Sequence, residues 1–595
     1  MQTLRRFIAG ADLRIAIPLA VVAALAIAPA LGWGIPVANH ADRGHGWGND
    51  DQVPLATLAE MQNSLSGESP PTRNYAYPLG QHLVWAACYA PVMAWEFATG
   101  GITSPSGEFP YGLEDPVGTI RALAWVGRLV DATMAVIGLL ALQAAGRCMG
   151  SRAGGVFAAL AMLFTWPFLY YARAGNPDAA VLMWTAVGLA ATAWILRDGY
   201  ARGSGCLLGA AIAAASATKE QSLGSFFLVV PTLLAIALWG RSERPLRARV
   251  ADVLWSGAAF SGVFVLWHGI WLDPARFVKH VQLLLLAGSG GVGGPGYLRH
   301  PPGLEGTWLQ AVDLGYQLVD AMTWPWLAVS AVGLVFVAIR APRFLVLSLS
   351  AVGFFSMLLL VGFSRVHYVL AIAAVLNLFA GAALGAWWDR GRRRGLVALA
   401  VAALLAVPVL RAIDLTADMR HDSRHAAAEW LATRMVAGQR AAYFGAPLKL
   451  PTLPDGVDLL QIDVAAEARP TIERERPEWL LAIPEDTDEF RQRVQWREGP
   501  LSVHGPYLPH REYLALARPG SGYRLVAQFQ SPRLLPWLDR PFLSYASVNP
   551  PVQVFVREDL AGDLTALSPW ETAPHYPKPG RLNEPLPLAL RPAGG

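Results

Sequence analysis

The sequence predicts an α-helical polytopic membrane protein with a C-terminal α/β domain. Of its 595 residues, 54% are hydrophobic and only 15% are charged, whereas soluble domains carry about 25% charged residues. Apolar runs recur up to residue 412, and most are long enough to cross a hydrocarbon core of about 30 Å as a helix. From residue 413 onward, charges and prolines replace these runs. We therefore expect a transmembrane module over 1–412 and a separate domain over 413–595.

We expect about eleven membrane helices from the apolar runs. They fall near residues 14–35, 119–146, 154–171, 179–196, 204–218, 222–240, 251–271, 321–340, 343–362, 366–388 and 396–412. Arginines gather in alternate loops: Arg5/Arg6, Arg147/Arg152, Arg197/Arg202, Arg241–Arg249, Arg340/Arg343 and Arg390–Arg394. Under the positive-inside rule these loops are cytoplasmic. The N-terminus is then cytoplasmic and the C-terminal domain lies outside, in the periplasm of a cell with an inner (cytoplasmic) membrane.

One apolar stretch, 82–97, is not counted as a crossing. Counting it would place every later arginine-rich loop on the outer face. Its tryptophan and tyrosine content suits an amphipathic helix that lies in the membrane interface. The loop 36–118 is therefore expected on the outer face, with interfacial helices.

The C-terminal domain shows weaker patterns. Residues 423–435 have apolar positions at helical spacing, and 440–444, 479–483 and 552–556 are typical of strands. The domain contains no glycine-rich nucleotide motif and no cluster of metal ligands, so no chemistry is assigned to it. Three scattered cysteines, Cys88, Cys148 and Cys206, do not form a disulfide framework.

Acidic residues on the expected outer face are the first candidates for function. Asp50 and Asp51 follow the first crossing, and Asp178 stands at the start of a predicted helix. Charge near hydrocarbon is costly, which makes such residues functional candidates. The structural alternatives are a solvated loop for the pair and a helix N-cap for Asp178.

Cations and aromatic residues share that face with the acids. A carboxylate there can act as general base on a hydroxyl or amine, and cations can hold a phosphate leaving group. This combination suits a substrate with a lipid tail and a phosphate. Lys219 needs a partner, either Glu220 or a lipid phosphate. The complete set is Asp50, Asp51, Arg73, Tyr77, Arg173, Asp178, Lys219, Arg365, His367 and Tyr368.

The sequence lacks the motifs that are typical of several classes of protein function. No Walker motif, no Ser/His/Asp pattern and no dinucleotide fingerprint occurs, which argues against ATP hydrolysis by this chain. The formal net charge of +4 says little about partners by itself, and no nucleic-acid partner is expected. A reaction whose energy comes from the lipid-phosphate substrate itself would need none of these motifs.

The order of short motifs resembles one family, the GT-C glycosyltransferases of the dolichyl-phosphate-mannose–protein mannosyltransferase and lipid A aminoarabinose transferase group, as a bacterial member. Asn49–Gln52 stands where the family has an Asp-Glu pair, and Tyr77–Gly80 stands where it has a Tyr-Pro-Pro-Leu segment. Two differences occur, Asp-Asp for Asp-Glu and one proline for two. The remaining matches are Arg128, Gly146–Gly150, Pro167, Arg173, Pro177-Asp178, Lys219 and Arg365–Tyr368.

The resemblance implies a GT-C fold and an inverting transfer of a sugar, hexosyl or pentosyl, from a polyprenyl-phosphate donor to a glycan, lipid or protein acceptor. Asp50 or Asp51 would be the base, with Asp178 as a second acid. The donor phosphate would meet Arg173, Lys219, Arg365 and His367, and Tyr77, Tyr368 and Arg73 would belong to the substrate loops.

The resemblance leaves metal dependence open. Two carboxylates could hold Mg²⁺ or Mn²⁺, as in related oligosaccharyltransferases, whereas mannosyltransferase-like members mostly do without one. No metal ligand is assigned. The rival functions are a transporter or flippase of a lipid-linked sugar, for which we see no internal repeats or discontinuous helices, and a non-catalytic membrane scaffold.

Overall fold

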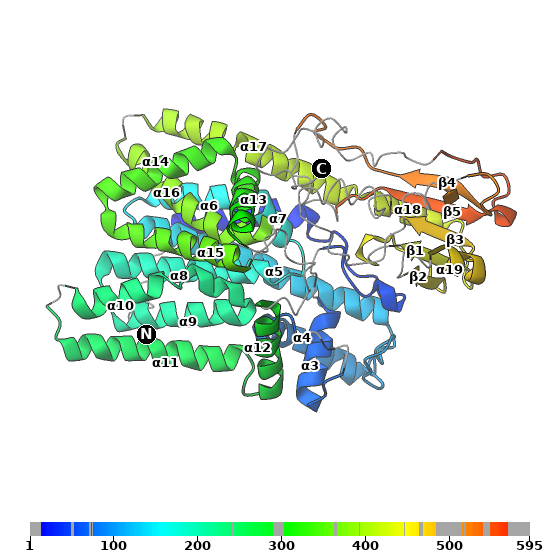
Figure 1. The fold of residues 1–595 in the computed structure, drawn as a ribbon, viewed down its shortest axis with the longest axis horizontal. Coiled ribbons are helices and arrows are strands. Elements are labelled where there is room, and N and C mark those ends of the chain that lie inside the picture. Colours follow the sequence, from blue (N-terminus) through cyan, green and yellow to red (C-terminus); the bar gives the residue numbers. More distant parts are fainter. Residues whose placement is uncertain are drawn as a thin grey trace.

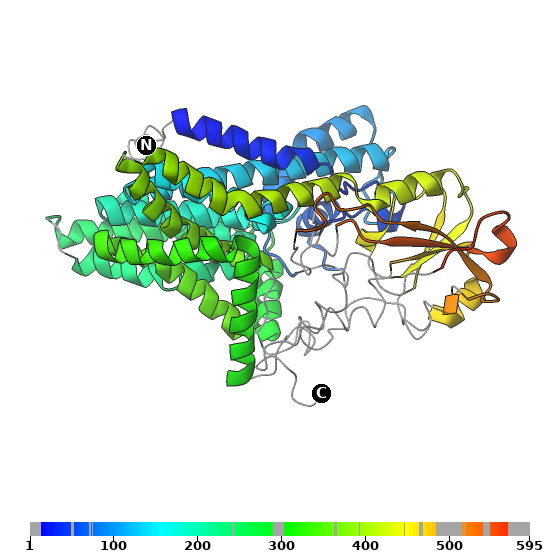
Figure 2. The same ribbon diagram turned by 90° about the horizontal axis from the view of Figure 1, so that it is seen from above.

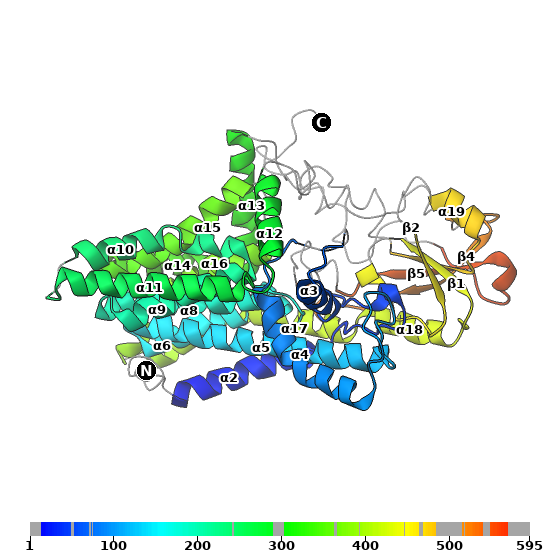
Figure 3. The same ribbon diagram turned by 90° about the horizontal axis from the view of Figure 1, so that it is seen from below.

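The computed structural model describes residues 13–48, 51, 53–70, 73, 75–240, 243–288, 303–361, 366–391, 393–444, 447–462, 468–483, 515–516, 518–538 and 548–568. A helical bundle occupies one end of an elongated molecule and a small sheet occupies the other (Figure 1). Short helices and loops lie between the two (Figures 2 and 3). The predicted class, a mostly helical membrane protein with a C-terminal α/β domain, is confirmed.

The bundle follows the predicted apolar runs. Its elements are α2 (Leu13–Ile27), α5 (Pro116–Cys148), α6 (Arg152–Leu163), α7 (Trp166–Tyr171), α8 (Asp178–Asp198), α9 (Arg202–Thr218), α10 (Val229–Trp239), α11 (Leu246–Trp267), α13 (Leu304–Met322), α14 (Trp324–Arg340), α15 (Ser348–Val361), α16 (Val369–Asp389) and α17 (Arg394–Arg420). Short 3₁₀ segments adjoin them: η1 (Ala28–Ala30), η3 (Glu220–Ser225), η5 (Pro342–Leu347) and η6 (Val366–Tyr368).

Among the described residues, seven helices are long and apolar enough to cross a membrane, or eight if the bent pair α13–α14 is one span. The other predicted crossings consist of shorter helices. The run 154–171 divides into α6 and α7, and 222–240 divides into η3 and α10. The pair α13–α14 bends by 102°, so α13 projects away from the bundle (Figures 2 and 3).

Small residues allow the helices to pack closely. A Cβ added to Gly146 would lie 2.6 Å from the Gly155 Cα, and one added to Gly154 would lie 2.6 Å from the Gly381 carbonyl oxygen. Close approach through small residues is a common way to pack helices in a membrane. Here it brings α5, α6 and α16 together.

Three of the arginine-rich loops, those that contain Arg197, Arg244 and Arg343, meet at one end of the bundle. Arg343 donates to the Arg197 carbonyl at 3.4 Å, and Arg244 donates to the Tyr200 carbonyl at 3.1 Å. Since α8 ends and α9 begins here, the start of α8 and the end of α9 lie at the opposite end of the bundle.

The loop 36–118 contains η2 (Ala41–Arg43), α3 (Leu55–Ser66) and α4 (Gly80–Thr99). Helix α4 covers the stretch predicted to be interfacial and is not among the candidate spans. It packs on α5 and buries Trp85 and Tyr89, while Trp95 is 67% exposed and Phe97 is 74% exposed. With α12 (Pro274–Gly288), α3 and α4 lie at the bundle end that faces the sheet (Figure 1).

The C-terminal region begins with a long helix. Helix α17 continues through residue 412 to Arg420, and α18 (Ser423–Ala432) follows. The other elements are β1 (Arg440–Phe444), η7 (Pro447–Lys449), β2 (Asp458–Ile462), α19 (Ala468–Glu475), β3 (Trp479–Ala482), β4 (Tyr523–Phe529), β5 (Val552–Arg557) and η11 (Glu558–Leu560). The predicted helix over 423–435 and the three predicted strands are present, and β2 and β4 are additional.

In the described part of this region, five strands form a mixed sheet in the order β2-β1-β3-β5-β4. Strand β1 pairs in parallel with β2 and β3, and β5 pairs antiparallel with β3 and β4. Alternate residues enter two different apolar clusters, Tyr443 and Leu481 in one and Phe444 and Leu480 in the other. Both faces of the sheet are therefore covered, as parallel pairing usually requires.

A buried carboxylate joins this region to the loop after α2. Asp422 accepts hydrogen bonds from Trp33 Nε1 at 3.0 Å, Arg424 Nε at 2.8 Å, Arg424 Nη2 at 2.7 Å and the Asn549 backbone N–H at 2.7 Å. The Asp422 and Arg424 side chains are 0% exposed. The Arg424 guanidinium lies 3.8 Å from the centre of the Trp47 ring. This joint fixes the loop that leads to Asp50 and Asp51.

We expect Asp422→Ala to destabilise the joint. Removing one partner of a buried ion pair costs about 3–5 kcal/mol, because the other charge stays buried. The melting temperature in detergent should fall, and proteolysis of the sheet region should become faster. Arg469→Ala is the matched control, because Arg469 pairs with Glu473 while 70% exposed; it should leave both measurements unchanged. Equal melting temperatures for the two variants would contradict the role of the joint.

Candidate active site

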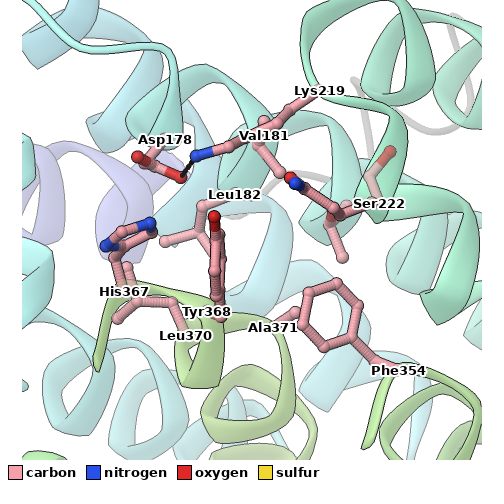
Figure 4. A pocket seen from close by; sticks show the side chains of 12 residues that line it. Asp178, Val181, Leu182, Lys219, Ser222, Phe354, His367, Tyr368, Leu370 and Ala371 are labelled. Atoms are coloured by element: carbon pink, nitrogen blue, oxygen red, sulfur yellow. Dashed lines mark hydrogen bonds and ion pairs between the residues drawn. The ribbon is translucent and has the colours of Figure 1, made fainter. Parts of the chain in front are cut away.

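A small cavity lies where α8 begins, α9 ends and α16 begins. Its volume of about 20 Å³ is room for roughly one water molecule. Polar side chains form one side, and Val181, Leu182, Phe354, Leu370 and Ala371 form much of the rest (Figure 4). The polar lining residues are Asp178, Thr185, Lys219, Gln221, Ser222, His367 and Tyr368.

An ion pair stands at this cavity. The Lys219 ammonium lies 2.9 Å from Asp178 Oδ1, with side chains 5% and 7% exposed (Figure 4). Glu220, the alternative partner suggested by the sequence, instead lies 3.6 Å from His280 Nε2. The two groups meet because α9 stops at Thr218 and Lys219 takes an extended conformation, with φ −159° and ψ 115°.

Asp178 does not cap its own helix. Helix α8 has Pro177 at its N-cap, without a side-chain cap bond, and Asn176 Oδ1 accepts the Asp178 backbone N–H at 2.7 Å. The N-cap interpretation of this carboxylate is therefore wrong. Its second oxygen, Oδ2, is buried and has no hydrogen-bond partner among the described residues.

Aromatic residues surround the lysine. The Lys219 ammonium lies 5.1 Å from the centre of the Tyr368 ring and 5.5 Å from that of Tyr77, which are distances of cation–π attraction. His367 lines the same cavity, and its Nδ1 lies 2.9 Å from the Tyr171 hydroxyl. The structure thus brings together Asp178, Lys219, His367, Tyr368 and Tyr77, all predicted from the sequence.

Asp51 lies elsewhere, in a buried pair with Arg128. Arg128 Nη2 lies 2.9 Å from Asp51 Oδ2, with side chains 0% and 1% exposed. The same guanidinium donates to the Leu31 carbonyl at 3.0 Å and the Gly34 carbonyl at 3.1 Å. Asp51 is therefore the counter-ion of a buried cation. Asp50 lies outside the described residues.

Arg173 also donates hydrogen bonds to backbone carbonyls, and it does not line the cavity. Its guanidinium donates to the Ala26 carbonyl at 2.5 Å, the Ile27 carbonyl at 3.2 Å and Thr416 Oγ1 at 2.8 Å. It thereby satisfies carbonyls at the end of α2, where a cation is favourable, and ties α2 to α17. The predicted contact of Arg173 with a phosphate finds no support in this placement. Arg365 lies outside the described residues.

Arg73 belongs to a charged cluster between α3 and α12. Arg73 Nη2 lies 2.8 Å from Asp273 Oδ2 and 3.5 Å from Glu60 Oε2. Arg276 Nε lies 2.6 Å from the same Glu60 oxygen, and its Nη2 donates to the Tyr77 carbonyl at 2.7 Å. Arg73 does not line the cavity. It belongs to the cluster that, through Arg276, holds Tyr77 beside Lys219.

One histidine near this cluster, His82, is neutral at physiological pH. Burial and, to a smaller extent, the charge of Arg276 lower the pKa of His82 to about 3. The cluster therefore consists of two cations, Arg73 and Arg276, and two carboxylates, Glu60 and Asp273. These formal charges balance.

The described residues do not fit a divalent cation. Within them, no group of three or more His, Cys, Asp or Glu side chains could hold a metal ion. Asp51 and Asp178 each face a cationic side chain at 2.9 Å, whereas Mg²⁺ and Mn²⁺ need several oxygen ligands. We derive no step through a metal.

Three polar lining residues were missed from the sequence: Thr185, Gln221 and Ser222. A helical projection could have found Thr185, because it lies about two turns beyond Asp178 on the same face of α8. Gln221 and Ser222 follow Lys219 in the 3₁₀ segment η3. Uncharged residues of this kind carry no signal in the sequence unless a neighbour marks the site.

We expect Asp51→Asn to act on stability. The change leaves Arg128 buried without its counter-ion, which costs about 3–5 kcal/mol. The melting temperature of the purified protein should drop, and the yield of folded protein should drop with it. A variant that melts like wild type but has lost its activity would return Asp51 to the catalytic residues.

No protein-family model matches this chain, and no curated protein matches it. Among solved structures, ArnT from Cupriavidus metallidurans bound to undecaprenyl phosphate aligns over 93% of this chain and 100% of its own, with 16% identity and a TM-score of 0.47. The oligosaccharyltransferase AglB from Archaeoglobus fulgidus, in complex with an inhibitory peptide and a dolichol-phosphate, aligns over 91% and 88%, with 10% identity and a TM-score of 0.46. Both TM-scores are below 0.5.

Proposed function

We propose that this protein is a membrane glycosyltransferase that moves a sugar from a polyprenyl-phosphate-linked donor to a glycan, lipid or protein acceptor. The observation that carries the proposal is the buried Asp178–Lys219 pair at the cavity. A buried ion pair is weak evidence for stability, because desolvation offsets its attraction. Ionisable groups inside a membrane bundle commonly mark substrate sites.

The surroundings of the pair suit a lipid phosphate. Lys219 supplies the cation, and helices α8 and α16 both begin at this cavity. Helix N-termini favour anions, through their unpaired N–H groups and the macrodipole. The apolar lining residues suit a prenyl chain or the C–H faces of a sugar. A donor with both parts therefore matches the chemistry of the lining.

The proposed reaction inverts the anomeric carbon. An acceptor hydroxyl or amine attacks that carbon while the bond between carbon and phosphate oxygen breaks. Polyprenyl phosphate leaves with the electron pair, and Lys219 stabilises the new negative charge. The acceptor's proton passes to a carboxylate. We assign this role to Asp50, since Asp51 is held by Arg128, and Asp178 orients Lys219 and the acceptor.

The orientation follows from the distribution of charge. The loops that contain Arg197, Arg244 and Arg343 meet at the bundle end opposite the cavity. With those loops cytoplasmic, the cavity opens toward the outer face of the cytoplasmic membrane, and the sheet region lies in the periplasm. Donor and acceptor would then meet outside the cytoplasm.

A transporter of the same lipid-linked sugar is the second candidate. The observation in its favour is the pair α13–α14, which bends by 102° at a short break. Discontinuous helices of this kind occur in transporters. Transport requires binding without cleavage of the sugar–phosphate bond, so turnover distinguishes the two candidates.

Substitutions of Asp178 and Lys219 should distinguish an effect on the rate of transfer from an effect on the affinity for the lipid phosphate. Asp178→Asn should lower kcat by about 10²-fold, the loss typical of misplaced reacting groups, because Asp178 orients Lys219 and the acceptor. Lys219→Met should weaken binding of a short-chain polyprenyl phosphate by at least about tenfold, the loss of roughly one charge-assisted hydrogen bond. Initial rates and isothermal titration check these values. Unchanged rates in both variants would contradict the assignment of the site.

Transfer itself is tested with radiolabelled donors. Purified protein is mixed with short-chain polyprenyl-phosphate sugars and a crude envelope extract, beside Asp50→Asn. Wild type should transfer label to the extract, and the variant should lose transfer while keeping its melting temperature. Full transfer by Asp50→Asn would refute the base assignment, and donor binding without turnover for any acceptor would favour the transporter.

A further inference from the structure

Asp131 of α5 is a buried carboxylate that the proposed reaction does not use. Its Oδ1 accepts hydrogen bonds from Gln81 Nε2 and Trp85 Nε1, each at 3.0 Å. Both donors stand on α4, one helical turn apart, and all three side chains are buried. Residues at this spacing lie on the same face of a helix. Asp131 therefore ties the first two turns of α4 to α5.

The start of α4 also touches the end of α9. A Cβ added to Gly80, the first residue of α4, would lie 2.4 Å from the Ala217 carbonyl oxygen and 2.8 Å from Trp267 Cδ1. A side chain larger than a hydrogen atom would therefore push α4 away from α9. Ala217 lies in the last turn of α9, two residues before Lys219. Gly80 thus lets α4 rest directly on the turn that leads to Lys219.

Tyr77 connects this contact with the ion pair. It precedes α4 by three residues, and its ring centre lies 5.5 Å from the Lys219 ammonium. Its carbonyl accepts a hydrogen bond from Arg276 Nη2 at 2.7 Å. The segment before α4 is therefore fixed by α12, and the helix that follows it is fixed by α5 and α9. A shift of the first turn of α4 would move the Tyr77 ring relative to Lys219.

We propose that Asp131 and Gly80 are positioning residues for Lys219. Asp131 holds the first turns of α4 in place, and Gly80 allows these turns to lie against the end of α9. The Lys219 ammonium then keeps the position between Asp178 and Tyr77 from which it receives a lipid phosphate. Neither Asp131 nor Gly80 lines the cavity, so both act through α4. The proposal rests on the proposed function for the role of Lys219, and binding without turnover tests it.

The experiment measures the affinity of the protein in nanodiscs for a bare short-chain polyprenyl phosphate. Asp131→Leu removes the acceptor of two buried N–H groups and should weaken binding by about tenfold, the loss of roughly one charge-assisted hydrogen bond. Asp131→Asn keeps an acceptor oxygen and should keep most of the affinity. Gly80→Ala places a methyl group against the Ala217 carbonyl and should weaken binding by a similar factor to Asp131→Leu. It decides the question if Asp131→Leu does not fold.

Two matched controls lie elsewhere in the bundle. Asn377 of α16 is buried, its Oδ1 accepts a hydrogen bond from Trp326 Nε1 at 2.6 Å, and it does not line the cavity. Asn377→Leu should lower the melting temperature as Asp131→Leu does, because it also removes a buried acceptor, and should leave the affinity unchanged. A Cβ added to Gly257 of α11 would have open space around it in the described part of the chain. Gly257→Ala should change neither measurement.

A double-mutant cycle separates positioning of Lys219 from a general loss of stability. In the Lys219→Met background, Asp131→Leu should cause no further loss of affinity, because the contact that it supports is already absent. A further tenfold loss in that background would overturn the proposal. Wild-type affinity of both Asp131→Leu and Gly80→Ala, equal losses in Asp131→Asn and Asp131→Leu, or an equal loss in Asn377→Leu would overturn it as well.

Failure of the proposed function gives a different result. Wild-type affinity of Lys219→Met would remove the role of Lys219 in phosphate binding, and this proposal with it. Absence of sugar transfer by wild type would remove the enzymatic function and leave the binding constants as they are. Weak binding by Lys219→Met together with wild-type affinity of the Asp131 and Gly80 variants would overturn the positioning role alone.

Discussion

The contact between Asp178 and Lys219 imposes the main constraint on this molecule. Two opposite charges lie 2.9 Å apart at the end of a helical bundle, almost without access to water. Such a pair is costly to bury, and it forms only if α8 begins and α9 ends at the same level. The close packing of α8 against α5 and α9 provides that alignment. The adjoining cavity exists because these helix ends do not fill the space between them.

Buried arginines hold the loops around this site. Arg128, Arg173, Arg276 and Arg424 each donate to backbone carbonyl oxygens, and each is at most 2% exposed. Loops cannot be fixed by a regular hydrogen-bond ladder, and an unpaired carbonyl is costly near a membrane. The planar guanidinium offers five N–H donors and can therefore gather several carbonyls at once. This arrangement joins the first loop, the bundle and the sheet region.

The difference between local properties of the sequence and contacts between distant residues explains which predictions from sequence succeeded. Apolar runs predict bundle helices well, because length and hydrophobicity are local properties. They predict breaks poorly, and the run 154–171 hides the boundary between α6 and α7. Asp178, Lys219 and His367 were predicted to share a site and do line one cavity. Arg73 and Arg173 do not line it, and in sequence a cation that binds a carbonyl or carboxylate looks the same as one that binds a phosphate.

The difference between Asp51 and its neighbour in the sequence also required structure. The sequence presents two equivalent carboxylates, and only the contact with Arg128 shows that Asp51 is engaged. Gln221 and Ser222 escaped prediction for a related reason: these uncharged residues become noticeable only when their burial and missing hydrogen bonds are known. Tertiary contacts therefore supplied what residue type alone could not.

The central claim is that Lys219 receives the phosphate of a polyprenyl-phosphate donor. The most direct measurement is an electron cryo-microscopy structure of the protein in nanodiscs with a short-chain polyprenyl phosphate. We expect phosphate density within ion-pair distance of Lys219 Nζ, beside Tyr368 and the start of α8. Phosphate bound elsewhere, with the Asp178–Lys219 pair still enclosed and unchanged, would contradict it.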